Sequence, residues 1–157
     1  MEKDKKEKKD RWFLGGTCSG EDWRKELIPY LEKRNIDYFN PLIRGKPWEK
    51  SDEENENIEK NKKCNVHLFL FTPNIGIFSI AEVVNSCWEI KTNTNVVQHV
   101  YFVTLGYFEN KAFKRMNATK RLCKDIAGDK VTLIHAKYIS DIFKEVDKNM
   151  NLYKYET

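Results

Sequence analysis

Five short apolar segments alternate with longer segments of helical periodicity, and this alternation constrains the fold more than any other feature of the chain. The apolar segments are expected to form β-strands, and the segments between them helices. The strands are expected at 11–16, 36–39, 66–72, 99–105 and 131–134. The helices are expected at 19–35, 51–63, 81–90, 110–128 and 138–150. Such an alternation predicts a parallel sheet that is covered by helices on both faces.

The segment at 66–72 is expected to be the central strand of this sheet. Its sequence, VHLFLFT, is almost continuously apolar, as expected for a strand that is buried on both faces. The chain has 157 residues, which is the size of one domain with a substantial core. We therefore predict a single α/β domain over 11–157, with a five-stranded flavodoxin-like sheet in the order 2-1-3-4-5.

A charged segment precedes this domain. Its cations are Lys3, Lys5, Lys6, Lys8, Lys9 and Arg11, interleaved with Asp4, Glu7 and Asp10. We expect residues 1–10 to be a solvated, poorly ordered tail, with a phosphate-binding arm as the alternative. Residues 1–11 hold six cations and four acids, Glu2 included, so they contribute +2 of the net charge of +4, and the rest of the chain, at +2, is close to neutral. We therefore do not expect the protein to bind nucleic acid.

Composition and residue spacing exclude several other classes of protein. No stretch reaches the roughly 18 apolar residues of a membrane helix, and the N-terminus lacks the apolar core of a signal peptide. The four cysteines are far apart in sequence and form no CxxC pair, which predicts reduced thiols in a cytoplasmic protein. No metal site is expected, because the three histidines lie in or beside apolar segments, away from the cysteines. These residues are Cys18, Cys64, Cys87, Cys123, His67, His99 and His135.

The predicted topology locates a ligand site. In a sheet of this order a crevice opens at the carboxyl ends of strands 1 and 3, where the sequence has GGTCSGED and TPNIGIFS. Gly15 and Gly16 are expected to let a ligand approach the backbone, beside unpaired N–H groups of the following helix. The second loop leads to Glu82, so the topology brings this carboxylate to the same crevice.

Glu82 has a second interpretation, because Ser79 and Glu82 have the spacing of a capping box. The same spacing recurs at Ser19 and Asp22 and at Ser51 and Glu54. On the residues alone, helix capping and catalysis both stay open for Glu82, and the two roles are compatible. Other signatures are absent: GGTCSG is neither a P-loop nor a dinucleotide fingerprint, and no G-x-S-x-G elbow is present.

Two blocks of sequence, within 12–105, carry a resemblance to a known family. They are FLGGTCSGEDWRKELIPYLEKRNIDYFNP and FLFTPNIGIFSIAEVV. Together they resemble the nucleoside 2-deoxyribosyltransferases, particularly their small phage and bacterial branch. The resemblance implies that Glu82 attacks C1′ of a 2-deoxyribonucleoside or its 5′-monophosphate, without a cofactor. A covalent deoxyribosyl-glutamate forms, and a second base or water then takes the sugar.

The same resemblance implies the surroundings of Glu82. The sugar or phosphate side is expected to comprise Gly15, Gly16 and Thr17, the base side Asn40 and Trp48, and the wall beside Glu82 Asn74, Phe78 and Ser79. Turn and packing roles explain Asn40 and Trp48 equally well. Members of the family form homo-oligomers with shared active sites. The segment GYFENKAF at 106–113 is a candidate contact surface, with loop-tip packing as the alternative.

The chain departs from the family at the acids that orient the sugar and protonate the base. No acid stands between Asn74 and Ser79, and Asn65 occupies a position where an aspartate is usual. Asp52, Glu53 and Glu54 are the candidates for the missing acid. Two alternative functions follow. One is a non-catalytic nucleotide-binding module on the same fold, and the other is a TIR-like NAD glycohydrolase, which also has a glutamate on the helix after strand 3.

Overall fold

The five predicted strands are present and form one parallel sheet. The computed structural model describes residues 9–42 and 46–155. The strands are β1 (Arg11–Gly16), β2 (Asp37–Phe39), β3 (Val66–Phe71), β4 (His99–Leu105) and β5 (Val131–Ala136). Their order is β2-β1-β3-β4-β5, and every neighbouring pair is parallel. The protein is therefore a single α/β domain with the predicted flavodoxin-like sheet.

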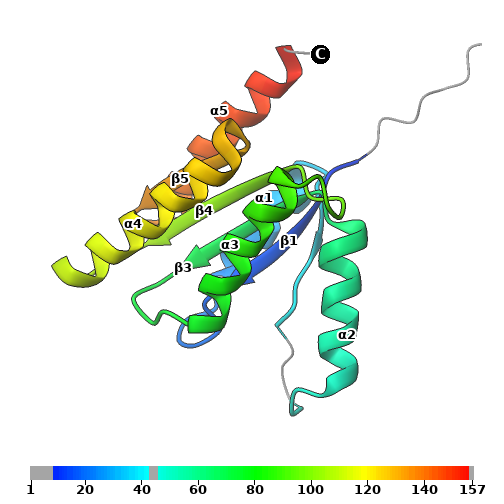
Figure 1. Ribbon diagram of the computed structural model, residues 1–157, viewed down its shortest axis with the longest axis horizontal. Coiled ribbons are helices and arrows are strands. Elements are labelled where there is room, and N and C mark those ends of the chain that lie inside the picture. Colours follow the sequence, from blue (N-terminus) through cyan, green and yellow to red (C-terminus); the bar gives the residue numbers. More distant parts are fainter. Residues whose placement is uncertain (1–8, 43–45, 156–157) are drawn as a thin grey trace, which may run out of the picture.

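Helical segments connect and follow the strands. They are α1 (Arg24–Lys33), α2 (Lys50–Ile58), α3 (Ile77–Lys91), α4 (Asn110–Ala127) and α5 (Ile139–Tyr155). Helix α2 continues directly into a π-helix, η1 (Glu59–Lys63), and α4 continues into a short 3₁₀ turn, η2 (Gly128–Lys130). Figure 1 shows α3 and α4 across the near face of the sheet and α2 to one side of β1.

Successive side chains of each strand point to opposite faces of the sheet, which gives the domain two cores. On one face, α1 and α5 cover the strands, and the ring of Tyr30 stacks on that of Phe143 with centroids 4.1 Å apart. This core contains Trp12, Leu14, Leu68, Leu70, Tyr101 and Val103 from the sheet, Trp23 from the turn before α1, and Leu27, Leu31, Ile142 and Val146 from the helices.

The opposite face is rich in phenylalanine and is covered by α3 and α4. Its core includes Phe13, Phe69, Phe71 and Phe102 from the sheet and Val83, Cys87, Met116, Cys123 and Ile126 from the helices. Every residue of β3 is buried, as the apolar sequence of this strand predicts. Because each fully buried large apolar side chain contributes about 1.5–3 kcal/mol, the two cores fix the strand ends that carry the site.

The helix starts contradict the predicted capping boxes. Helix α3 begins at Ile77 after the N-cap Gly76, so Ser79 lies inside the helix and does not cap it. The box of α2 is formed by Glu49 and Asp52, two residues earlier than Ser51 and Glu54. Ser19 precedes the start of α1 at Arg24 by more than a full helical turn. Glu82 is therefore free of a capping role.

Other expectations can be compared with the described residues. The four cysteines are free thiols, and His67 and His99 are buried. Within residues 9–42 and 46–155 there is neither a helix that is long and apolar enough to cross a membrane nor a cluster of potential metal ligands. In the segment at 106–113, Phe108 is buried in the core and Tyr107 is exposed. Residues 1–8 of the predicted tail lie outside the described residues.

Candidate active site

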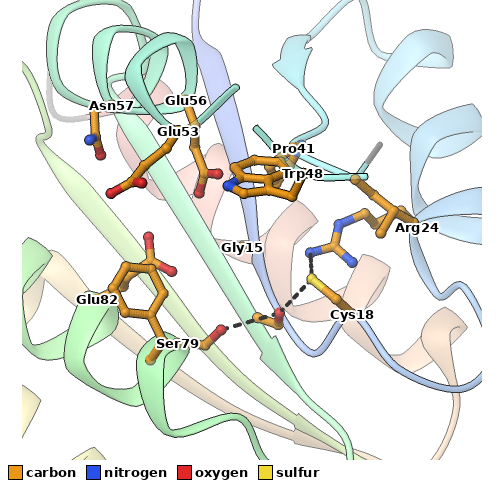
Figure 2. Close-up of a pocket in the computed structure, with 13 residues that line it drawn as sticks. Gly15, Cys18, Arg24, Pro41, Trp48, Glu53, Glu56, Asn57, Ser79 and Glu82 are labelled. Carbon is orange, nitrogen blue, oxygen red and sulfur yellow. Dashed lines mark hydrogen bonds between the residues drawn. The ribbon is translucent and has the colours of Figure 1, made fainter. Parts of the chain in front are cut away.

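A cavity of about 460 Å³ opens at the carboxyl end of β1, between α2 and α3 (Figure 2). The sheet reverses its winding direction at this point, so the cavity lies where the topology predicts a ligand site. Its volume is within the range of sites for small molecules. It is lined by Gly15, Gly16, Cys18, Arg24, Pro41, Leu42, Trp48, Glu53, Glu56, Asn57, Phe78, Ser79 and Glu82.

Glu82 lies in the second turn of α3 and directs its carboxylate toward the cavity. Figure 2 shows Glu53 and Glu56 reaching the same space from α2, on the opposite side. One oxygen of Glu82, Oε2, accepts a hydrogen bond from Lys60 Nζ at 2.6 Å, and each of the two side chains is 10% exposed. The predicted nucleophile is therefore neither on open solvent nor inside a packed core.

Glu56 is the carboxyl group with the most altered acidity in the cavity. Partial burial raises the pKa of Glu56 to about 7, and the neighbouring Glu82 adds to this increase. Lys60 and Arg24 act in the opposite direction on the same pKa. Glu56 therefore keeps its proton up to about neutral pH, while Glu82 is paired with a cation. A cavity that holds both a protonated carboxyl group and a carboxylate paired with a cation offers the two forms that an acid and a nucleophile use.

The π-helix η1 determines where Lys60 lies. Its widened turn is closed by the Cys64 N–H, which donates to the Glu59 carbonyl five residues earlier at 2.9 Å. The Lys60 carbonyl accepts a hydrogen bond from His67 Nε2 at 3.0 Å, so the proton of His67 is on Nε2. His67 Nδ1 then accepts the hydroxyl of Ser86 at 2.8 Å. Since burial lowers the pKa of His67 to about 4, this ring stays neutral at pH 7.

Gly15 and Gly16 line the cavity, but the structure shows that strand packing, and not the approach of a ligand, excludes a side chain at both positions. A Cβ on Gly15 would lie 2.6 Å from the ring of Phe69. A Cβ on Gly16 would lie 2.0 Å from the Leu70 carbonyl oxygen, and Gly16 has a φ of +112°. Both glycines are thus required by the packing of β1 against β3.

A cation lies at the end of the cavity away from Glu53 and Glu82 (Figure 2). Arg24 is fully buried, and its guanidinium donates to the Leu14 and Thr17 carbonyls, each at 3.0 Å. Its third contact is the Cys18 sulfur at 3.9 Å. Figure 2 shows Arg24 and Cys18 on the side opposite Glu53 and Glu82. Charge is therefore separated across the cavity, and burial lowers the pKa of Arg24.

The start of α1 differs from the expected anion site with unpaired N–H groups. The Arg24 N–H donates to the carboxylate of Asp22 at 3.2 Å. The Trp23 N–H donates to the Glu21 carbonyl at 3.1 Å, and Glu26 lies in the first turn. These acidic side chains disfavour an anionic ligand at this helix end.

Six of the nine predicted site residues line the cavity: Gly15, Gly16, Trp48, Phe78, Ser79 and Glu82. Thr17 is buried beside it and donates its hydroxyl to the Asn74 carbonyl at 3.2 Å. Asn40 Oδ1 accepts a hydrogen bond from the Leu42 N–H at 3.0 Å. This is the turn role that the sequence predicted as the alternative to a contact with the base. Asn74 lines a second cavity, of about 330 Å³.

Sequence reasoning anticipated Glu53 at the site but missed Cys18, Arg24, Glu56, Asn57 and Lys60. Glu56 and Lys60 did carry a signal, because residues four apart on a helix are neighbours and these two have opposite charge. That signal occurs at many exposed helical positions, so it did not separate Glu56 from Glu54. Glu56 and Lys60 are distinguished from other oppositely charged helical pairs only by the three-dimensional position of η1 beside α3.

Comparison of the chain with family models, with curated proteins and with solved structures gives no match. The function is therefore inferred from the fold, from the cavity and from the side chains that line it.

Proposed function

We propose that the protein cleaves or exchanges the N-glycosidic bond of a 2-deoxyribonucleoside or its 5′-monophosphate, with Glu82 as the nucleophile. One observation carries this proposal: the Glu82 carboxylate shares a cavity with Glu56, a carboxyl that keeps its proton near neutral pH. Cleavage through a covalent sugar–enzyme intermediate uses one carboxylate and one carboxylic acid. The resemblance to nucleoside 2-deoxyribosyltransferases supports the same reaction.

In the first step, Oε1 of Glu82 attacks C1′ of the sugar, since Oε2 is held by Lys60. The bond from C1′ to the base nitrogen breaks, and its electron pair goes to the base. Glu56 donates its proton to the base, which leaves as a neutral molecule. A 2-deoxy sugar suits this step, because its cation-like C1′ forms more easily without a 2′-hydroxyl. The ring of Trp48 lines the cavity and offers a stacking surface for the base.

In the second step, a second base or a water molecule attacks C1′ of the deoxyribosyl ester. Glu56, now a carboxylate, accepts the proton of the attacking group, and Glu82 leaves as a carboxylate. Both carboxyl groups thereby return to their starting forms. Transfer and hydrolysis differ only in the group that takes the sugar.

We also propose that the enzyme works in the cytoplasm as a homo-oligomer. The free thiols of Cys18, Cys64, Cys87 and Cys123 support a reducing compartment. Ile77 and Phe78, at the start of α3 beside the cavity, are 90% and 71% exposed. Apolar side chains of this size on a helix start favour a covering partner, such as a second copy of the chain.

The proposed reaction is tested by incubating the protein with 2-deoxynucleosides, their 5′-monophosphates and NAD, and measuring released base by chromatography. We expect base release from a deoxyribosyl substrate, and Glu82→Gln should lower its rate by at least about 1,000-fold. Glu54→Gln is the matched control, because Glu54 is exposed on α2 and lies outside the cavity lining. Unchanged turnover in Glu82→Gln overturns the proposal, and nicotinamide release from NAD alone favours the TIR-like alternative.

A nucleotide-binding module without catalysis is the second candidate, and one contact favours it. The 2.6 Å contact with Lys60 neutralises Glu82 and lowers the charge that is available for attack on C1′. Saturable nucleotide binding in isothermal titration, with intact ligand recovered after hours, would establish this candidate in place of the enzyme.

A further inference from the structure

We infer that Lys60 is a positioning residue that balances charge for two carboxyl groups in turn: it holds Glu82 before the glycosidic bond breaks and serves Glu56 after Glu56 has given up its proton. This inference rests on the proposed function, and it deepens the account of the same site. It assigns a role to a lysine that lies outside the cavity lining but donates a hydrogen bond to the Glu82 carboxylate.

The geometry joins the three groups. Lys60 Nζ is 2.6 Å from Glu82 Oε2, and both side chains are 10% exposed, so water screens the pair only weakly. Glu56 precedes Lys60 by four residues across the junction of α2 and η1, and the charge of Lys60 acts on the acidity of Glu56. Glu56 and Glu82 line the same cavity. One ammonium group therefore stands within electrostatic reach of both carboxyl groups.

The proposed reaction moves one negative charge between these carboxyl groups. Before the first step Glu82 is anionic and Glu56 is protonated; afterwards Glu82 is a neutral ester and Glu56 is anionic. The three groups have zero net charge in both states if Lys60 stays protonated. Without Lys60 they would carry an uncompensated buried negative charge throughout, which is unfavourable at low solvent exposure. A fixed cation that serves both states needs no rearrangement during the reaction.

The backbone of Lys60 is held as firmly as its amine. Its carbonyl accepts from His67, which in turn accepts from Ser86, one helical turn after Glu82 on α3. The chain of contacts therefore starts on α3, passes through β3 and η1, and returns to α3. Such a closed path limits the movement of the ammonium group relative to Glu82. The ammonium charge of Lys60 can then stabilise the Glu82 carboxylate and later the Glu56 carboxylate from one position, with little motion of the side chain.

The charged groups around Glu56 come from every neighbouring element. They are Glu82 on α3, Lys60 on η1, Arg24 on α1 and Glu53 on α2 itself. The two glutamates favour the protonated form of Glu56, and the two cations favour its ionised form. Removing the cation of Lys60 should therefore move the titration of Glu56 to higher pH. Removing the charge of Glu82 should move it to lower pH.

The first experiment follows the carboxyl carbon of Glu56 by NMR across pH, without a substrate. Relative to wild type, Lys60→Met and Lys60→Gln should raise the midpoint by about one pH unit, and Glu82→Gln should lower it. Lys62→Met is the matched control, because Lys62 is exposed in the same η1 segment and its ammonium group donates to Asn95 Oδ1 at 3.3 Å, away from Glu56 and Glu82. A Glu56 midpoint that is equal in wild type and in both folded Lys60 variants overturns the inference.

The second experiment measures kinetics on a substrate that the wild type cleaves. Lys60→Met should lower kcat by about 100-fold with little change in KM, and Lys60→Arg should restore most of the activity. The activity limb at high pH should shift upward in Lys60→Met together with the Glu56 midpoint. A variant that keeps the wild-type kcat overturns the role of Lys60. A wild type that cleaves no substrate overturns the proposed function instead, and the titration then decides the inference alone.

Discussion

At the scale of single residues, three glutamates of α2 and α3 have the same side chain but lie in three different environments. Glu54 is exposed on α2, Glu56 is partly buried with a raised pKa, and Glu82 is paired with Lys60. Desolvation, with a further contribution from the charge of Glu82, raises the pKa of Glu56 above that of a glutamate in an unfolded chain. The proposed division into acid and nucleophile therefore depends on the fold and not on the residue type.

The raised pKa of Glu56 predicts a pH-dependent loss of stability. Its folded pKa of about 7 lies above the ordinary value of 4.5, so the folded state is favoured at low pH and loses stability as pH rises through about 7. Glu56→Gln should increase the free energy of unfolding at pH 8 by about 1 kcal/mol, after allowance for partial solvent exposure, and by less at pH 5. Denaturant unfolding at both pH values measures this. Equal differences at both pH values, as expected for Glu54→Gln, would contradict the raised pKa.

At the scale of elements, the site depends on how closely β1 approaches β3. Gly16 pairs with Leu70, and the Thr17 N–H donates to the Leu70 carbonyl at 2.9 Å just beyond the strand. Ser79 and Cys18 both donate to the Gly16 carbonyl, at 3.3 and 3.4 Å. The end of β1 is thereby fixed to the start of α3, the helix that carries Glu82.

Gly16→Ala should be strongly destabilising for this reason. The new Cβ would collide with the Leu70 backbone at 2.0 Å, and the φ of +112° is unfavourable for alanine. We expect a loss of about 3 kcal/mol or more in the free energy of unfolding. Gly106→Ala is the matched control, because Gly106 also has a positive φ, of +93°, but a Cβ there would meet no atom within 4 Å. It should lose only about 1 kcal/mol, and equal losses in the two variants would exclude the collision.

At the scale of the whole molecule, α1 and α5 meet across one face of the sheet and join distant parts of the chain. Asp147 on α5 accepts hydrogen bonds from Arg34 at 2.8 Å to each oxygen, and from the Tyr30 hydroxyl at 2.6 Å. The Arg34 guanidinium also lies 3.7 Å from the centre of the Tyr30 ring. This cluster fixes the covering layer behind β1 and therefore supports the cavity from the far face.

Asp147→Asn should weaken this connection in a pH-dependent way. Hydrogen bonding to Arg34 lowers the pKa of Asp147, so its contribution is present above the ordinary aspartate pKa and is lost as pH falls through the lowered folded value. We expect a loss of about 1 kcal/mol at pH 7, because the pair is partly exposed. The loss should shrink toward zero at the acid end of a denaturant series. Glu145→Gln, on an exposed part of α5, is the control and should change stability little at any pH.

The strands and their order could be predicted because the apolar segments, although short, are separated by clear polar and helical segments. Helix starts were predicted less well, since the serine–acid spacing near Ser19, Ser51 and Ser79 did not mark the N-caps that the structure has. Glu82 was located by topology, because the helix after β3 begins at the crevice, and its role as a nucleophile was predicted from the family resemblance. Lys60 was not found, since its position depends on a π-turn that no local pattern in η1 predicts.

The most direct test of the account is to identify the sugar-bearing residue by peptide mass spectrometry after acid quench during turnover of a deoxyribosyl substrate. We expect a deoxyribosyl adduct on the peptide that contains Glu82, with fragment ions that assign it to that side chain. The adduct should be absent from Glu82→Gln and should persist in Glu54→Gln. Base release at the wild-type rate with the adduct on another residue, or with Glu82 replaced, would contradict the central claim.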